Sequence, residues 1–176
     1  MIGEAIWNDA DILKPFALSL NAPFICQFFK DPLDQTSPYW DYVIGNEAEA
    51  EAFAESHDLK TKDIPTIAKY LANLPKKNEK RKRTAIITQG TEPTIIAVQG
   101  DDNVKTFPVH KIDAKDINDT NGAGDAFAGG FFAGVAKGES LERCVDMGQW
   151  LATVSLRELG PSYVRPSPRD FQHPFD

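Results

Sequence analysis

Residues 119–127, DTNGAGDAF, combine a glycine-rich loop with the start of a helix. The small side chains of Gly122, Ala123 and Gly124 leave the backbone amides open, so a ligand can approach the backbone closely. A helix N-terminus adds unpaired N–H donors and roughly half a positive charge. The pattern favours a phosphate site, and the alternative is an ordinary glycine turn in which Asp125 is a first-turn carboxylate.

Two further groups of polar residues stand where apolar segments end. Asn46 and Glu49 follow residues 41–45, DYVIG, and an Asn with a Glu three positions later predicts a capping box that stabilises a helix by about 1 kcal/mol. Thr88, Gln89 and Gly90 follow the apolar run that begins at residue 84. Ligands bind at strand ends in open α/β sheets, so this second group is either a ligand contact or a plain strand exit.

Alternating strands and helices must position these residues. The apolar patterns predict strands at residues 17–20, 41–45, 84–88, 94–99 and 104–108. They predict helices at residues 24–30, 47–56, 63–74, 125–136 and about 141–159. The first of these would be ended by Pro32, the second opened by Asn46 and the third capped by Asp63. This order predicts an α/β layer fold with a partly parallel sheet, in which residues 1–176 form a single domain.

The last predicted helix carries a stripe of small and apolar residues at helical spacing. The stripe consists of Leu141, Cys144, Val145, Gly148, Leu151, Ala152, Ser155 and Leu159. In the preceding helix, the pair Gly129 and Gly130 destabilises a helix relative to alanine, so we expect close packing of that helix on the sheet or on its neighbour as compensation.

Charge and hydropathy exclude several classes of partner. The 176 residues carry a net charge of -7, which disfavours nucleic acid and anionic lipid as partners. No uncharged run, residues 126–136 included, reaches the roughly 20 residues that cross a bilayer. Residues 1–11 hold three acidic and no basic side chains, unlike the start of a signal peptide. We therefore expect a cytoplasmic protein with no nucleic-acid and no membrane partner.

Six of the eight residues in the run 76–83 are basic. A nuclear-import signal or a polyphosphate site would have this composition, and the former would add the nucleus as a second compartment. Because Pro75 and Asn78 interrupt regular structure, the simplest interpretation is a solvated loop.

Isolated side chains favour structural roles. Cys26 and Cys144 show no CxxC spacing and are predicted to be buried free thiols. The histidines show no metal-ligand spacing and are predicted at the surface; they are His57, His110 and His173. The tryptophans are predicted in the core or at its edge; they are Trp7, Trp40 and Trp150.

The run DTNGAGDAFAGGF, residues 119–131, resembles the signature of the ribokinase-like family of small-molecule kinases. The resemblance extends to LNAPFICQFF at 20–29, YVIGNEAEA at 42–50, ITQGTEPTI at 87–95 and FPV at 107–109. It covers the chain from about residue 17 to the end, and within the family it is strongest to the adenosine kinases. This resemblance implies a ribokinase-like fold. It also implies ATP-dependent phosphorylation of adenosine to AMP, which is a step of purine salvage.

The resemblance also implies roles for individual residues. Asp125 would be the general base that accepts the proton of the adenosine 5′-hydroxyl, and Gly122, Ala123 and Gly124 would form the anion hole. Asn46 and Glu49 would hold Mg²⁺ indirectly, through water. ATP would be contacted by Thr88, Gln89, Gly90, Asn121 and Gln149. Phe24, with Asp125, would bind adenosine. For Phe24 a core position is the alternative.

Three functions stay open at this point. The first is an adenosine kinase with adenosine and MgATP as substrates, monomeric at full length; the second is another ribokinase-like sugar or nucleoside kinase. The third is a nucleotide-binding fragment without turnover. The family's full-length members carry further strands, a Gly-Gly nucleoside loop and a small lid ahead of the matched region. We therefore expect this chain to be the C-terminal, ATP-binding part, inactive on its own.

Overall fold

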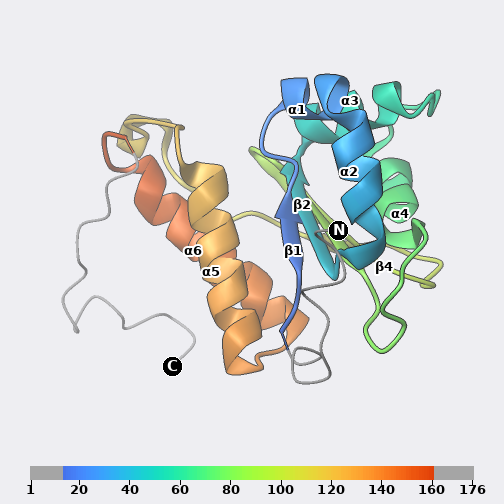
Figure 1. Ribbon diagram of the computed structural model, residues 1–176. Helices are drawn as coiled ribbons and strands as arrows, with labels where there is room; N and C mark the ends of the chain where they lie inside the picture. The colour runs from blue at the N-terminus through green and yellow to red at the C-terminus, as the bar shows by residue number, and fades with distance from the viewer. Residues whose placement is uncertain (1–13, 161–176) are drawn as a thin grey trace. The chain divides into compact units, whose positions relative to one another are not determined.

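The computed structural model describes residues 14–160, and these form two compact units that divide between Val109 and His110 (Figure 1). The expectation of a single domain over the whole chain stays a prediction.

The first unit is built on a five-stranded sheet with the strand order β1-β2-β3-β4-β5. The strands are β1 Ala17–Ser19, β2 Tyr42–Asn46, β3 Thr84–Gln89, β4 Glu92–Val98 and β5 Lys105–Phe107. The first three strands run parallel, while β4 is antiparallel to β3 and β5 is antiparallel to β4. The sequence-based expectation of a partly parallel sheet is confirmed.

Helices of the same unit bury one face of the sheet. They are α1 Pro23–Phe28, α2 Lys30–Thr36, the 3-10 helix η2 Ser37–Tyr39, α3 Glu47–Ser56 and α4 Ile64–Asn73 (Figure 1). Cys26 of α1, Phe53 of α3 and Leu71 of α4 share one hydrophobic core with Val43 and Ile87 of the sheet. Since side chains alternate between the two faces of a strand, Ile44 and Ile86 point to the opposite face, where they are also buried.

The prediction that Pro32 ends a helix is wrong. Helix α1 ends at Phe28, and α2 begins at Lys30 with Pro32 as its third residue. The N–H groups of a first helical turn have no partner within the helix, so a proline there removes no hydrogen bond. Asn21, which lies between β1 and α1, adopts a left-handed φ of 66°.

The solvated-loop prediction for residues 76–83 fails at both ends of the run. The Arg83 side chain is fully buried, and its Nε donates to the Trp40 carbonyl at 3.0 Å. Its two terminal nitrogens donate to the carbonyls of Ser37, Leu71, Leu74 and Pro75. Burial lowers the pKa of Arg83 to about 10, so the guanidinium stays charged at neutral pH. It thereby joins the ends of η2 and α4 to the start of β3.

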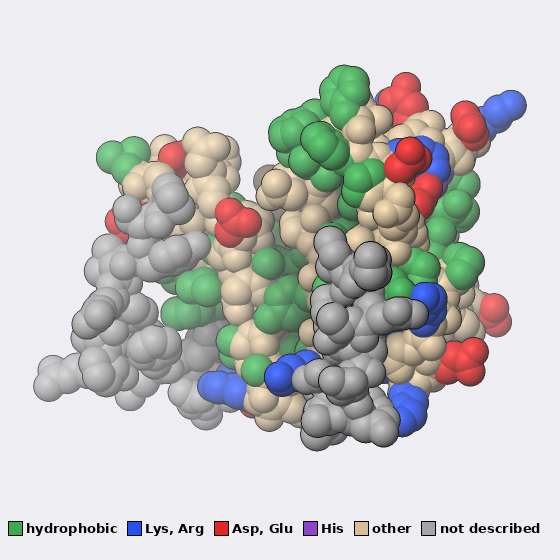
Figure 2. Space-filling view, viewed as in Figure 1, with side chains coloured by type: hydrophobic (Ala, Val, Ile, Leu, Met, Phe, Trp, Pro, Cys, Tyr) green, Lys and Arg blue, Asp and Glu red, His purple; other side chains and the backbone are tan. Residues whose placement is uncertain are grey.

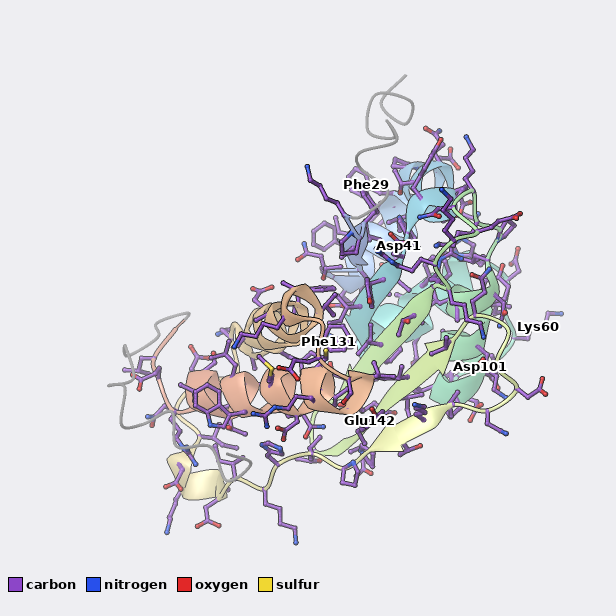
Figure 3. All side chains as sticks on the ribbon, turned by 90° about the horizontal axis from the view of Figure 1, so that it is seen from below. Phe29, Asp41, Lys60, Asp101, Phe131 and Glu142 are labelled. Carbon is purple, nitrogen blue, oxygen red and sulfur yellow. The ribbon has the colours of Figure 1, made fainter. Side chains whose placement is uncertain are left out.

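Lys76 is the other buried member of this run. Its Nζ lies 2.7 Å from Oδ1 of Asp41, a fully buried carboxylate just before β2 (Figure 3). The second oxygen of Asp41 accepts from the backbone N–H of Phe16 at 3.0 Å. The interpretation as solvated side chains therefore holds only for the middle of the run, where Lys77, Lys80 and Lys82 are exposed.

His57 is likewise not the surface residue that the sequence predicts. Its side chain is 6% exposed, its Nε2 lies 2.8 Å from Oδ1 of Asp34, and its ring stacks on Phe53 with centroids 3.9 Å apart. His110 is partly exposed and its Nε2 lies 2.9 Å from Oδ1 of Asp146. His173 and Trp7 lie outside the described residues, whereas Trp40 is fully buried as predicted and Trp150 is half-buried.

The second unit contains the 3-10 helix η3 Ala114–Asp116 and the helices α5 Ala123–Lys137 and α6 Leu141–Leu156. Glycines allow α5 and α6 to pack closely: a Cβ at Gly130 would overlap the Met147 carbonyl, and one at Gly148 would lie 2.8 Å from the Phe127 oxygen. The predicted compensation for a glycine inside α5 is confirmed. Leu159, predicted to continue the apolar stripe, lies beyond α6 and is 77% exposed.

Cys26 and Cys144 are both buried and free, as predicted. Within residues 14–160, none of the helices combines the length and the hydropathy that crossing a membrane requires.

Candidate functional site

The carboxyl end of β2 carries the predicted capping box. Asn46 Oδ1 accepts from the Glu49 N–H at 2.9 Å, and Glu49 Oε2 accepts from the Asn46 N–H at 3.0 Å. A third hydrogen bond runs from Asn46 Nδ2 to Glu49 Oε1 at 2.9 Å. Both carboxylate oxygens of Glu49 are therefore held in place over the end of the strand.

Gly45 makes this arrangement possible. A Cβ at this position would lie 2.9 Å from Oε2 of Glu49 and 2.9 Å from Cδ1 of Leu20, so a larger residue would push the Glu49 side chain away. Glu49 itself is 6% exposed. Burial, together with the nearby Glu49 charge, raises the pKa of Cys26 to about 11 and keeps that thiol protonated. The sequence analysis gave Gly45 no role, because a glycine at a strand end has no distinctive pattern around it.

The parallel pairing of β2 with β3 brings a second predicted group beside Asn46. Thr88 is the register partner of Asn46, and its Oγ1 donates to the Gly45 carbonyl at 3.4 Å. Gln89 Nε2 donates to the Pro93 carbonyl at 2.5 Å within the turn that joins β3 to β4. Gly90 occupies that turn with φ 58° and open space around it. Asn46 and Thr88 are thus adjacent, whereas the Gln89 side chain is engaged in the turn.

Phe24 lies on α1 with 53% of its surface exposed. Phe28 and Phe29 are also exposed, at 79% and 48%, and Figure 2 shows hydrophobic side chains gathered over this end of the first unit. The exposure of Phe24 excludes the alternative of a core phenylalanine.

The start of α5 has the geometry that the glycine-rich pattern predicts. Gly122 is the N-cap residue with a left-handed φ of 82°, and no side chain caps the helix. Helices α3, α4 and α6, in contrast, are capped by side chains of Asn46, Asp63 and Ser140. A Cβ at Gly124 would meet nothing within 4 Å. The Ala123 N–H donates to the Thr120 carbonyl at 3.4 Å, whereas the backbone at Gly124 faces open space with the exposed carboxylate of Asp125 beside it.

Asp119 shapes the loop that leads into α5. Its Oδ1 accepts from the backbone N–H and from Nδ2 of Asn121, both at 2.9 Å, and its Oδ2 accepts from the Gly160 N–H at 3.0 Å. These donors hold the pKa of Asp119 below its ordinary value. The sequence analysis assigned Asp119 no role of its own, although an Asp whose side chain accepts two residues further along is a recognisable turn signal.

Gln149 lies on α6 and is 6% exposed. Within the described part of the chain its Nε2 has no hydrogen-bond partner, and an unpaired buried donor destabilises a fold by about 1–3 kcal/mol. Asn121, the remaining predicted ATP contact, is exposed in the loop before α5.

The candidate residues divide between the two units. The first unit brings Asn46, Glu49 and Thr88 together at the carboxyl ends of β2 and β3, and the second places Asn121 and Asp125 at the start of α5. Among residues 14–160, no cluster of at least three His, Cys, Asp or Glu side chains could hold a metal ion by direct ligation.

Comparisons with known proteins agree with this geometry. The model of the pfkB family carbohydrate kinase matches residues 4–168. Adenosine kinase of Saccharomyces cerevisiae is 47% identical over 152 residues, which are 85% of this chain and 43% of that protein. The chain therefore spans less than half the length of this relative.

Solved structures give the same result in three dimensions. Anopheles gambiae adenosine kinase, in complex with P1,P4-di(adenosine-5) tetraphosphate, superposes with a TM-score of 0.79 at 42% identity, over 85% of this chain and 46% of that one. Schistosoma mansoni adenosine kinase, in complex with 2-fluoroadenosine, gives a TM-score of 0.82 at 37% identity, over 86% of this chain and 44% of that one.

Proposed function

Because the chain belongs to the pfkB family of carbohydrate kinases, we propose that it provides the ATP-binding and proton-accepting part of an adenosine kinase. The reaction moves the γ-phosphoryl group of ATP to the 5′-hydroxyl of adenosine and yields AMP and ADP. The observation that carries the proposal is the uncapped start of α5, with open amides and the Asp125 carboxylate side by side. Adenosine as the acceptor is supported by the relatives, since the similar proteins from two yeasts and a plant are adenosine kinases at 42–47% identity.

The amides of Gly122, Ala123 and Gly124 stabilise the negative charge that develops on the transferred phosphoryl group. During the reaction, negative charge develops on the oxygens of the phosphoryl group that is being transferred. Catalysis consists mostly of positioning the reactants and stabilising this charge electrostatically. A helix start that no side chain caps presents its N–H groups and its dipole to that charge without having to reorganise.

Asp125 accepts the proton that the attacking hydroxyl loses. It stands in the first turn of α5 and is exposed, so an acceptor hydroxyl can reach it while the transferred group lies over the amides. A positioned proton acceptor contributes about 10²- to 10⁴-fold to a rate.

Asn46 and Glu49 suit a magnesium ion that is bound through water. Mg²⁺ keeps several of its waters in proteins, and the carboxylate of Glu49, already fixed by Asn46, is an acceptor to which such waters can donate. When bound with ATP, the ion would neutralise phosphate charge. Gly45, which has no Cβ, leaves the room over the strand end that the Glu49 carboxylate occupies.

The remaining residues recognise the two nucleosides. The exposed ring of Phe24 offers a flat apolar surface for the adenosine base. The unpaired Nε2 of Gln149 is a donor for the adenine of ATP, and Asn121 and residues 88–90 contribute polar groups on the phosphate side.

A chimera tests the proposal. This chain replaces the matching segment of the Saccharomyces cerevisiae adenosine kinase, so that its own residues act in a protein of the relatives' length. We expect AMP formation from adenosine and MgATP, and we expect Asp125→Asn to lower it about 10²- to 10⁴-fold while ATP affinity changes only a few-fold. Asp113→Asn is the matched control, because Asp113 is 74% exposed and lies 3.4 Å from Lys115 alone.

Single-turnover AMP formation by Asp125→Asn within tenfold of the parent would refute the assigned proton acceptor. A panel of other nucleosides and sugars in the same assay addresses acceptor choice, and faster transfer to any of them than to adenosine overturns adenosine as the substrate. The 176-residue chain assayed alone tests whether it turns over without the rest of the relative's length.

A further inference from the structure

The loop that enters α5 and the turn that leaves α6 are joined by a set of hydrogen bonds. The backbone N–H of Asn118 donates to the Leu156 carbonyl at 2.8 Å, and its side-chain Nδ2 donates to the Arg157 carbonyl at 2.5 Å. The last carbonyls of a helix have no partner within the helix, so these bonds satisfy groups that would otherwise need water.

Asp119 closes this connection from the other side. One carboxylate oxygen accepts from the backbone and side chain of Asn121, inside the loop, and the other accepts from the N–H of Gly160, beyond α6. Gly160 adopts a left-handed φ of 68°, which glycine reaches without strain. A single carboxylate therefore fixes two separate backbone segments, one of which runs directly into Gly122.

We propose that Asp119 is a positioning residue, which sets the orientation of the amides at the start of α5 by holding Asn121 and Gly160 together. The proposal rests on the function proposed above for those amides. We call Asn118, Asp119, Asn121 and Gly160 the Asp119 brace. Displacements of about 1 Å in a catalytic group are enough to lower a rate a hundredfold, so a loop at this place has to be held firmly.

The chemistry of the carboxylate suggests the variant. Asp119→Asn keeps the volume but has only one accepting oxygen, because its second position carries an NH₂ group that donates. Facing the two sets of N–H donors, the amide can satisfy either Asn121 or Gly160 and must repel the other. Asp119 lies at the surface end of the helices, outside the packed contact of α5 with α6, so we expect the fold to remain.

Hydrogen exchange in the 176-residue chain tests the brace without requiring turnover. We expect the amide of Asn121 or of Gly160 to exchange at least about tenfold faster in Asp119→Asn than in the parent, with amides in the middle of α5 unchanged. Asp113→Asn, which removes one exposed carboxylate of the same loop, should leave both rates unchanged. Equal exchange at Asn121 and Gly160 in parent and Asp119→Asn overturns the brace.

Kinetics of the chimera then separate positioning from general stability. We expect Asp119→Asn to lower kcat for AMP formation about 10- to 100-fold, with KM for ATP and for adenosine within a few-fold of the parent. Faster exchange with unchanged kcat overturns the positioning role. If the parent chimera forms no AMP, the proposed function fails, while the exchange result still decides for or against the brace.

Discussion

At the scale of single residues, Glu49 has both a structural and a proposed catalytic role. In Glu49→Gln the side-chain oxygen can still accept from the Asn46 N–H, but the new NH₂ faces Asn46 Nδ2, so one of three hydrogen bonds is lost. We expect the free energy of unfolding to fall by about 1 kcal/mol. If Glu49 also orders water around magnesium, AMP formation by the chimera should fall and require more magnesium.

A magnesium titration of the chimera, with chemical unfolding measured in parallel, checks both effects. Glu47→Gln is the control, because Glu47 lies in the same first turn but is exposed. A titration curve for Glu49→Gln that superimposes on the parent curve would leave Glu49 with the capping role alone.

Gly124 allows activity and stability to be separated at one position. It is the second residue of α5, and a Cβ there would enter open space, so Gly124→Ala should raise the free energy of unfolding by about 0.5–1 kcal/mol. The same methyl would stand over the amides that we assign to phosphate, and we expect AMP formation to fall about 10- to 100-fold. Thermal unfolding and chimera kinetics measure the two changes, and a more stable variant with full activity would contradict the anion hole.

At the scale of elements, the contact of α5 with α6 depends on which of two adjacent glycines is changed. A Cβ at Gly130 would overlap the Met147 backbone, whereas one at Gly129 would have only Leu151 Cδ2 nearby, at 3.9 Å. We expect Gly130→Ala to lower the free energy of unfolding by about 1–3 kcal/mol and Gly129→Ala to raise it by up to about 1 kcal/mol. Urea unfolding of both variants checks the pair, and equal effects would contradict the close packing.

Local signals predicted the elements well where a cap or a turn residue was decisive. Asn46 and Asp63 open α3 and α4 as expected, because an N-cap side chain bonds amides only two or three residues away. The helix end at Pro32 was predicted wrongly, because a proline can either end a helix or stand in the first turn of one. Only the surrounding packing selects between these two outcomes.

At the scale of the whole molecule, cooperativity tests the expectation of a single domain. If residues 1–176 form a single domain, the two units unfold together. Because the chain also contains Trp7, the variants are made in a Trp7→Phe background, in which Trp40 reports on the first unit and Trp150 on the second. In that background Trp150→Phe and Trp40→Phe should give coincident urea transitions by fluorescence. Two separated midpoints would show that the units are independent domains.

The monomeric state stays a prediction from the family resemblance. The cytoplasmic location and the absence of nucleic-acid and membrane partners stay predictions from the sequence, and the net charge of -7 opposes binding to polyanions.

The sequence by itself determined the elements and the chemistry that depends on neighbours along the chain. The capping box of Asn46 and Glu49 and the glycine-rich entry to α5 follow from short spacings, because the atoms concerned are a few residues apart. The partly parallel sheet follows from the order in which strands and helices alternate. Tertiary structure alone decided the contacts between distant segments. Arg83 is buried among the carbonyls of η2 and α4, His57 is paired with Asp34, and Asp119 reaches Gly160 at a separation of 41 residues. From the sequence alone, a charged side chain is expected to face solvent, because burying a charge without partners is unfavourable. Only the fold can supply the partners that make its burial favourable.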